Sequence, residues 1–220
     1  MKSGLDFVGA IAYIPLVMKL ACCPAVKGRP REFDMDDALA AALRVFWSKG
    51  YEGASLSDLT EAMGITRPSL YAAFGNKESL FRKALDLYEC EKLAYIGEAL
   101  QAPTSRGVAE RLLRGALAMQ TSECEPKGCL RVISSVACGT EAESIRAEVI
   151  ARRASSHRAM LERFERAKGE GDLPDHVDAE GLANYMGAIL QGMAIQAGAG
   201  ASTAQLEALV DTSLAMWPGR

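Results

Sequence analysis

Five polar side chains lie close together between residues 66 and 77: Thr66, Arg67, Ser69, Tyr71 and Lys77. The planar guanidinium of Arg67 has the geometry that pairs bidentately with a guanine edge in the major groove of DNA. A lysine ammonium such as that of Lys77 and a tyrosine hydroxyl such as that of Tyr71 contact backbone phosphates. The cluster therefore carries the chemistry of duplex recognition.

Two short helices joined by a tight turn are expected to position this cluster. Ser55 and Asp58 form a capping box at the start of the first helix, and Gly64 supplies the left-handed residue that ends it. Thr66 caps the second helix, and Pro68 lies in its first turn, where the missing amide hydrogen costs little. The span from Ser55 to Phe74 has the dimensions of a helix-turn-helix.

The second of these helices buries only one side. Leu70 and Phe74 are four residues apart and face inward, so Thr66, Arg67, Ser69 and Tyr71 are left on the outer side. Any one of these polar residues alone would be explained by solvation of a surface helix. The whole set, with its caps and glycine turn, favours contact with DNA.

The flanking segments complete a small helical head. Asp34 caps a helix whose apolar stripe contains Phe46 and Trp47, and Gly50 is expected to end it. Asn76 caps a longer helix whose apolar pattern continues toward Leu100. Upstream, Arg29 and Arg31 lie on a basic arm that can reach the phosphate backbone or the minor groove.

The remainder of the chain is also predicted to be helical. Hydrophobic residues make up 49% of the sequence, which excludes wholesale disorder. Ala, Leu, Glu, Arg and Met dominate, whereas β-branched and aromatic residues (6%) are sparse, which favours helices over sheets, and there is no convincing strand or internal repeat. Glycine and proline separate the expected helices, at about 105–121, 128–138, 141–168, 178–198 and 203–216. The predicted fold is all-α, with a three-helix head at 27–85 and a larger helical bundle at 86–220.

The head resembles a known DNA-binding domain. Its segments 28–33, 46–51, 55–59, 64–71 and 74–80 are similar to the DNA-binding domain of the tetracycline-repressor (TetR) family. The resemblance covers about residues 27–85, and it implies that Arg67, Ser69 and Tyr71 lie in the recognition helix and that Lys77 contacts phosphate. It also implies a C-terminal domain that binds an effector and dimerises. Lys127-Gly-Cys-Leu130 is similar to a motif found in some subgroups of that family.

The expected function is that of a cytoplasmic, homodimeric transcriptional regulator, by family default a repressor that releases its operator when a small molecule binds. A dimer is expected because one recognition helix reads too few base pairs, so two half-sites in palindromic double-stranded DNA supply the affinity. Flexible thioethers adapt to varied ligands, so an apolar effector pocket is predicted. Its candidate residues are Met119, Met160, Tyr185, Met186 and Met193, although helical spacing is equally consistent with ordinary core.

The six cysteines show no spacing typical of a zinc site, and neither a metal nor a cofactor is expected. Cys124, Cys129 and Cys138 are candidate redox or electrophile-sensing thiols because Lys127 and Arg131 lie nearby; the alternative, and the preferred one, is that they are small buried hydrophobes. His157 and His176 are isolated and receive no catalytic or metal role.

The sequence leaves two alternative functions open. A hydrolase using Cys129 with His157 is a competing class, but no nucleophile elbow, phosphate loop or metal motif supports it. A helical interaction protein that keeps the head without reading DNA is another, and it would show no sequence preference in a binding assay.

Residues 1–26 precede the recognisable head. The apolar run from Phe7 to Val17 follows Lys2 and loosely resembles a secretory signal, but Asp6 and Pro15 interrupt it and it is too short to span a bilayer. We expect a non-native extension with translation starting near Met18 or Val26, or else a poorly ordered arm. No membrane association is expected.

Overall fold

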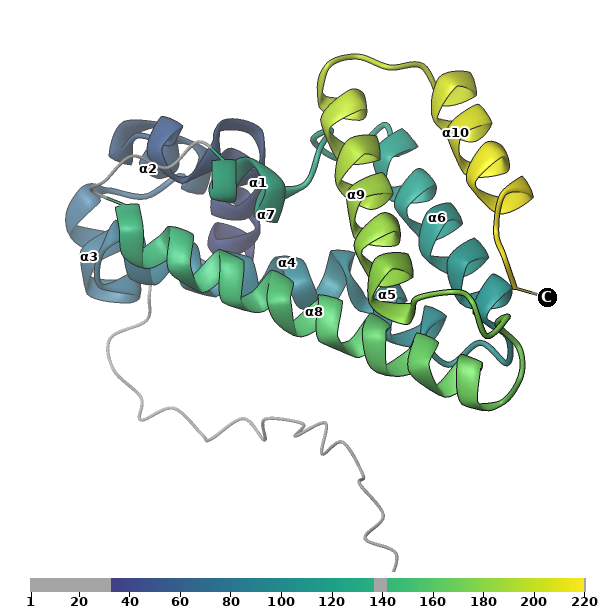
Figure 1. Ribbon diagram of the computed structural model, residues 1–220. Coiled ribbons are helices and arrows are strands. Elements are labelled where there is room, and N and C mark those ends of the chain that lie inside the picture. The colour runs from purple at the N-terminus through teal and green to yellow at the C-terminus, as the bar shows by residue number, and fades with distance from the viewer. Residues whose placement is uncertain (1–32, 137–141, 220) are drawn as a thin grey trace, which may run out of the picture. The chain divides into compact units, whose positions relative to one another are not determined.

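The computed structural model describes residues 33–136 and 142–219. Every regular element in those ranges is a helix, which confirms the predicted all-α class (Figure 1). The helices are α1 (Met35–Gly53), α2 (Leu56–Met63), α3 (Arg67–Phe74), α4 (Lys77–Lys92), α5 (Ala94–Ala99), α6 (Ser105–Thr121), α7 (Leu130–Val136), α8 (Glu143–Gly169), α9 (Ala179–Gly198) and α10 (Thr203–Ala215). Arg29, Arg31, Cys138 and the extension 1–26 lie outside the described residues.

The predicted helix caps of the head are confirmed. The backbone N–H of Asp36 donates to Asp34 Oδ1 over 2.8 Å at the start of α1. At the start of α2, the N–H of Asp58 donates to Ser55 Oγ over 3.1 Å, and the N–H of Ser55 donates to Asp58 Oδ2 over 3.0 Å. These bonds satisfy amide donors that have no partner within the helix. The helix boundaries of the head are therefore set locally.

Gly50 was predicted to end this helix, but it only interrupts α1, and one further helical turn follows it, to Gly53. Gly50 has φ +72°, a conformation that residues with a Cβ rarely adopt. An added Cβ at this position would lie 3.0 Å from Ile133 Cγ2 of α7. Glycine therefore provides both the turn and the close approach of α7 to α1.

The head shares its hydrophobic core with the following domain. Fully buried Phe46 and Phe81 belong to the same cluster as Leu130 of α7 and Val149 of α8. The predicted boundary between residues 85 and 86 falls inside α4, which runs on to Lys92. The head is thus packed against α7 and α8 rather than joined to them by a linker.

Helix α8 also connects to α4 through ion pairs. Glu148 accepts from Arg82 of α4 at 2.6 Å and from Arg152, one turn further along α8, at 2.7 Å. Arg152 in turn pairs with Asp86 at 2.7 Å and with Glu89 at 2.9 Å. Because several charges share one network, the ordering cost of each pair is reduced and α4 is held against α8.

A second core lies between α6, α8, α9 and α10. Leu112, Phe164, Met186 and Met193 are buried in it, and the Trp217 ring lies 5.5 Å from that of Phe164. No helix in the described ranges is both long and apolar enough to span a bilayer. The second core supports a cavity described below.

Candidate functional site

Helix α3 presents a polar outer face. Leu70 and Phe74 are buried against the head, whereas Arg67 and Tyr71 are exposed, Tyr71 to 47%. At the start of the helix, Thr66 Oγ1 and Ser69 Oγ lie 2.9 Å apart, and the Ser69 N–H donates to Thr66 Oγ1. The structure therefore orients four of the predicted contact residues around a short rigid helix.

Arg67 is held at the junction of α2 and α3. Its Nη2 donates to the Ser57 hydroxyl over 2.8 Å, and both side chains are exposed. A guanidinium carries five N–H donors, so this bond leaves most of them available to a ligand outside. Ser57 was not among the predicted residues, although its place on the outer side of the first helix was readable from the sequence.

Lys77 begins α4 beside the ring of Tyr51. Its Nζ lies 4.6 Å from the ring centroid, a cation–π geometry. Burial lowers the pKa of the Lys77 ammonium, and the charge of Glu52 acts in the opposite direction. An ammonium that is partly stripped of water at a helix N-terminus is placed to receive an anion.

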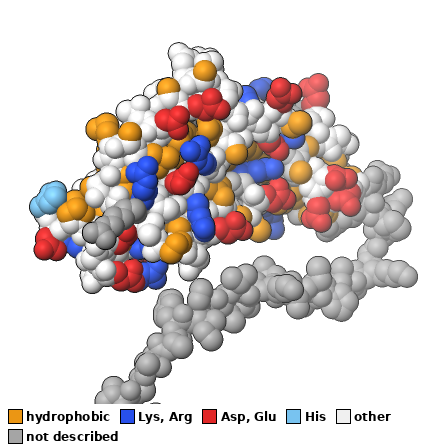
Figure 2. All heavy atoms as spheres, turned by 90° about the vertical axis from the view of Figure 1, so that its right-hand side faces the viewer, with side chains coloured by type: hydrophobic (Ala, Val, Ile, Leu, Met, Phe, Trp, Pro, Cys, Tyr) orange, Lys and Arg blue, Asp and Glu red, His pale blue; other side chains and the backbone are white. Residues whose placement is uncertain are grey.

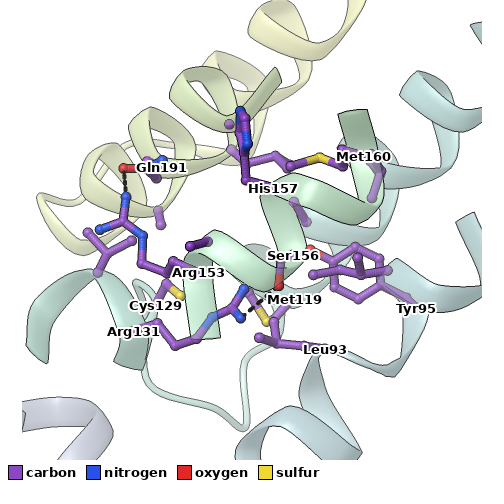
Figure 3. Close-up of a pocket in the computed structure, with 18 of the residues that line it drawn as sticks. Leu93, Tyr95, Met119, Cys129, Arg131, Arg153, Ser156, His157, Met160 and Gln191 are labelled. Atoms are coloured by element: carbon purple, nitrogen blue, oxygen red, sulfur yellow. Dashed lines mark hydrogen bonds between the residues drawn. The ribbon is translucent and has the colours of Figure 1, made fainter. Parts of the chain in front are cut away.

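A cavity of about 430 Å³ opens between α5, α6, α7, α8 and α9 (Figure 3). This volume lies within the range typical of small-molecule sites. Met119 and Met160, both predicted, line it. The other aliphatic and aromatic lining residues are Leu93, Tyr95, Ile96, Leu112, Ala116, Val132, Ile150, Ala154, Leu190 and Ala194.

Tyr185, Met186 and Met193 do not line this cavity. Met186 and Met193 are buried in the second core, and Tyr185 lies at the surface. Each residue of an α-helix advances by about 100°, so residues two positions apart face nearly opposite directions. The cavity is instead lined by Asn184, Gly187 and Gln191 of α9, which lie at spacings of three and four.

Polar groups converge on the cavity from α7, α8 and α9. Arg153 Nη1 donates to Ser135 Oγ over 2.9 Å, and its Nη2 donates to Gln191 Oε1. Arg131 Nη1 donates to Ser156 Oγ over 3.1 Å and pairs with Glu89 at 3.2 Å. His157 Nε2 lies 2.9 Å from Asn184 Oδ1. This histidine was interpreted as isolated, and that interpretation is wrong.

A buried hydrogen-bond junction connects the cavity to the head. Gln120, which lines the cavity, accepts from the Gly128 N–H over 2.8 Å and donates to the Gly128 carbonyl over 3.2 Å. The same carbonyl accepts from the indole N–H of Trp47, in α1, over 3.0 Å. The Gly128 carbonyl thus bonds both to the cavity wall and to the core of the head.

Comparison with known proteins agrees with this geometry. The family model for bacterial regulatory proteins of the tetR family matches residues 38–84. The transcriptional repressor ComR of Escherichia coli is 36% identical over 200 residues, which is 90% of this chain and 95% of ComR. The TetR-family regulator CifR, a cysteine mutant complexed with 26-bp double-strand operator DNA, is 44% identical. It superposes with a TM-score of 0.82 over 86% of this chain and all of that one.

The chain belongs to the TetR family of transcriptional regulators. A TetR-family regulator from Rhodococcus, 36% identical, covers 85% of the chain with a TM-score of 0.59. The likeness therefore covers the C-terminal helices that line the cavity as well as the head.

The cysteines of this TetR-family chain differ in accessibility. Cys124 is exposed, which contradicts its interpretation as a buried hydrophobe, and Cys129 is partly buried and lines the cavity. The Cys129 thiol neighbours the hydroxyl of Tyr88, whose pKa is raised mainly by burial. Thiol sensing by these residues stays a prediction. No cluster of potential metal ligands occurs in the described ranges.

Cys129 and His157, the candidate hydrolase pair, both line this cavity. The hydrogen bonds of the described residues join His157 to Asn184 rather than to the thiol. A cysteine nucleophile requires a base within hydrogen-bond reach, and these contacts do not form that arrangement.

Proposed function

We propose that this TetR-family chain is a homodimeric repressor that binds a palindromic operator in the cytoplasm and releases it when a small organic molecule occupies the cavity. The observation that carries the proposal is the exposed polar face of α3. Leu70 and Phe74 pack the opposite face into the core, and the Arg67–Ser57 hydrogen bond links α3 to α2. The related regulator CifR, which has been captured on operator DNA, supports it.

On DNA, each contact residue has a distinct role. Arg67, Ser69 and Tyr71 face base edges and the adjacent strand, while Thr66 and Lys77 approach phosphates at helix N-termini. Arg29 and Arg31 extend these contacts along the backbone or into the minor groove. Base contacts supply the sequence preference, and phosphate contacts supply most of the salt-dependent affinity.

The dimer is proposed to form through α9 and α10. Tyr185 and Ile195 of α9 and Met216 after α10 are exposed, Ile195 to 58% and Met216 to 70%. Ala188 and Gly192 continue the α9 stripe, and small residues allow close helix packing. Figure 2 shows the face that carries α10, where apolar side chains lie among charged ones. A two-fold contact here would set two α3 helices in successive major grooves, about 34 Å apart.

Release requires that the ligand bind more tightly to a conformation with poor DNA affinity. The Gln120–Gly128–Trp47 junction offers a route for this coupling, because a ligand that shifts Gln120 changes the hydrogen bonding of a peptide that also anchors α1. Closely packed cores convert such small shifts into discrete alternatives.

The proposal is tested by selecting bound sequences from a pool of random DNA duplexes with the purified chain at physiological salt. A repressor of this kind enriches a palindromic consensus with half-sites one helical turn apart. Enrichment of no sequence, with equal salt-sensitive binding to all duplexes, would contradict it and favour an interaction protein that has kept only the head.

A further inference from the structure

The described side chains that line the cavity include positive charges but no negative ones. Arg131 and Arg153 line it, and none of its described lining residues is Asp or Glu. Arg131 is already paired with Glu89, whose carboxylate lies outside the cavity lining. Arg153 has hydrogen bonds only to the neutral side chains of Ser135 and Gln191, and no ion pair among the described residues. Within residues 33–136 and 142–219, the Arg153 charge therefore has no neutralising carboxylate.

An unneutralised guanidinium favours an anionic ligand. The two bonds of Arg153 use two of its five N–H donors, and the fork of a guanidinium matches the two oxygens of a carboxylate. Charge-assisted bonds of this kind are strengthened where water is excluded, and much of the surrounding wall is apolar. A cationic ligand would instead meet repulsion from Arg131 and Arg153.

Three apolar lining residues lie on the side of the cavity away from Arg153. Figure 3 shows Arg153 and Gln191 on one side of the site, and Tyr95, Leu93 and Met160 on the other. The Tyr95 ring can pack directly onto α6 because residue 115 is glycine, where a Cβ would collide with the ring. Burial raises the pKa of Tyr95 well above its ordinary value, so the ring adds no negative charge.

We infer that the cavity binds a small amphipathic organic monocarboxylate, with its carboxylate on Arg153 and its apolar body against Tyr95, Leu93 and Met160. Its role as the effector rests on the proposed function, whereas the binding itself does not. A single unpaired charge matches one carboxylate, and the mainly apolar lining matches a hydrocarbon or aryl body.

The inference is tested by calorimetric titration of the full chain with five probes: octanoate, 3-phenylpropanoate, 1-octanol, 3-phenylpropanol and octylamine. At least one carboxylate should bind about tenfold or more tightly than its own alcohol, the usual effect of a charge-assisted hydrogen bond, and octylamine should bind most weakly. The inference would be overturned if an alcohol or octylamine bound as tightly as the carboxylates, or if neither carboxylate bound.

Two variants of Arg153 and one control variant of α8 test whether the Arg153 charge binds the carboxylate. Arg153→Gln should weaken the preferred carboxylate by about tenfold or more and leave its alcohol unchanged, and Arg153→Lys should retain part of the preference because it keeps charge but loses the fork. Arg158→Gln removes an exposed cation from outside the cavity lining and should change neither. Unchanged carboxylate binding by Arg153→Gln would overturn the assignment. A chain that binds the carboxylate as expected but selects no operator would contradict only the proposed function.

Discussion

The indole Nε1 of Trp47 lies 3.0 Å from the carbonyl oxygen of Gly128, 81 residues further along the chain. Trp47 is fully buried in the head, and Gly128 is bound on its other side by Gln120 of the cavity wall. Gly128 has φ +92°, a backbone conformation that residues with a Cβ rarely adopt. Helix α1 and the cavity wall are thus joined through one backbone carbonyl.

Trp47→Phe tests whether this junction transmits ligand binding. The variant loses one buried hydrogen bond and leaves a small cavity at a fully buried position, so the free energy of unfolding should fall by more than about 1 kcal/mol. Operator affinity without ligand should be kept, whereas the loss of affinity caused by octanoate should shrink. Fluorescence anisotropy of a labelled operator, with and without octanoate, measures both quantities.

Trp217→Phe is the matched control, because it removes a comparable indole bond, to Ser105, in the second core. Its response to octanoate should equal that of the wild type. Equal responses of Trp47→Phe and the wild type would show that coupling follows another route.

Cys129 reports occupancy of the cavity. Because its thiol lines the cavity and Cys124 is exposed outside it, a bound carboxylate should slow alkylation of Cys129 by iodoacetamide and leave Cys124 unchanged. Peptide mass spectrometry over a time course gives the two rates. Equal slowing of both thiols, or no slowing of Cys129 at a carboxylate concentration shown to saturate the chain, would place the ligand elsewhere.

Glu148→Gln tests the ion-pair network between α4 and α8. Burial acts to raise the pKa of Glu148, but its bonds to Arg82 and Arg152 outweigh burial and lower the pKa below the ordinary 4.5. A carboxyl whose pKa is lowered on folding contributes stability above its unfolded pKa, and that contribution is lost as the pH falls through the folded pKa. The variant should therefore be less stable by roughly 1 kcal/mol at pH 7, a value limited by partial exposure.

Below about pH 4 the stability difference should narrow, because the wild-type carboxyl also becomes protonated. Urea unfolding at a series of pH values measures the difference directly. A difference that stays constant from pH 7 to pH 3 would mean that charge is not what Glu148 contributes.

Ile195→Glu tests the proposed dimer surface. In a two-fold apolar contact, the new carboxylate would lie opposite the same carboxylate of the other subunit, and the two would repel. The variant should therefore be monomeric by sedimentation and bind the palindrome far more weakly. Ala147→Glu places the same charge on an exposed position of α8 and should stay dimeric. Dimeric Ile195→Glu would exclude this stripe as the interface.

The head was largely readable from the sequence because its signals are local. Capping pairs such as Ser55 with Asp58 and the inward pair Leu70 and Phe74 act within one or two turns, and the structure has them as predicted. The cavity was only partly readable. Met119 and Met160 were found by residue type, but Arg153 and Gln191 meet across α8 and α9, and that contact depends on how the two helices pack.

The same limit explains the errors on α9 and α8. Met186 and Met193 were chosen for their flexibility, whereas the helical phase that sends them into the core is fixed by tertiary packing. His157 was taken as isolated because Asn184, its partner, is 27 residues away. Contacts between distant segments leave no pattern in a single sequence.

The central claim is that the outer face of α3 distinguishes one base sequence from another, and Arg67→Ala tests it most directly. Binding to the selected palindrome and to a shuffled duplex of equal length is compared at physiological salt, with Arg166→Ala, an exposed arginine of α8, as control. We expect Arg67→Ala to lose about 1–3 kcal/mol per half-site on the palindrome, with far less effect on the shuffled duplex. Equal loss on both duplexes, or no loss on either, would contradict the account.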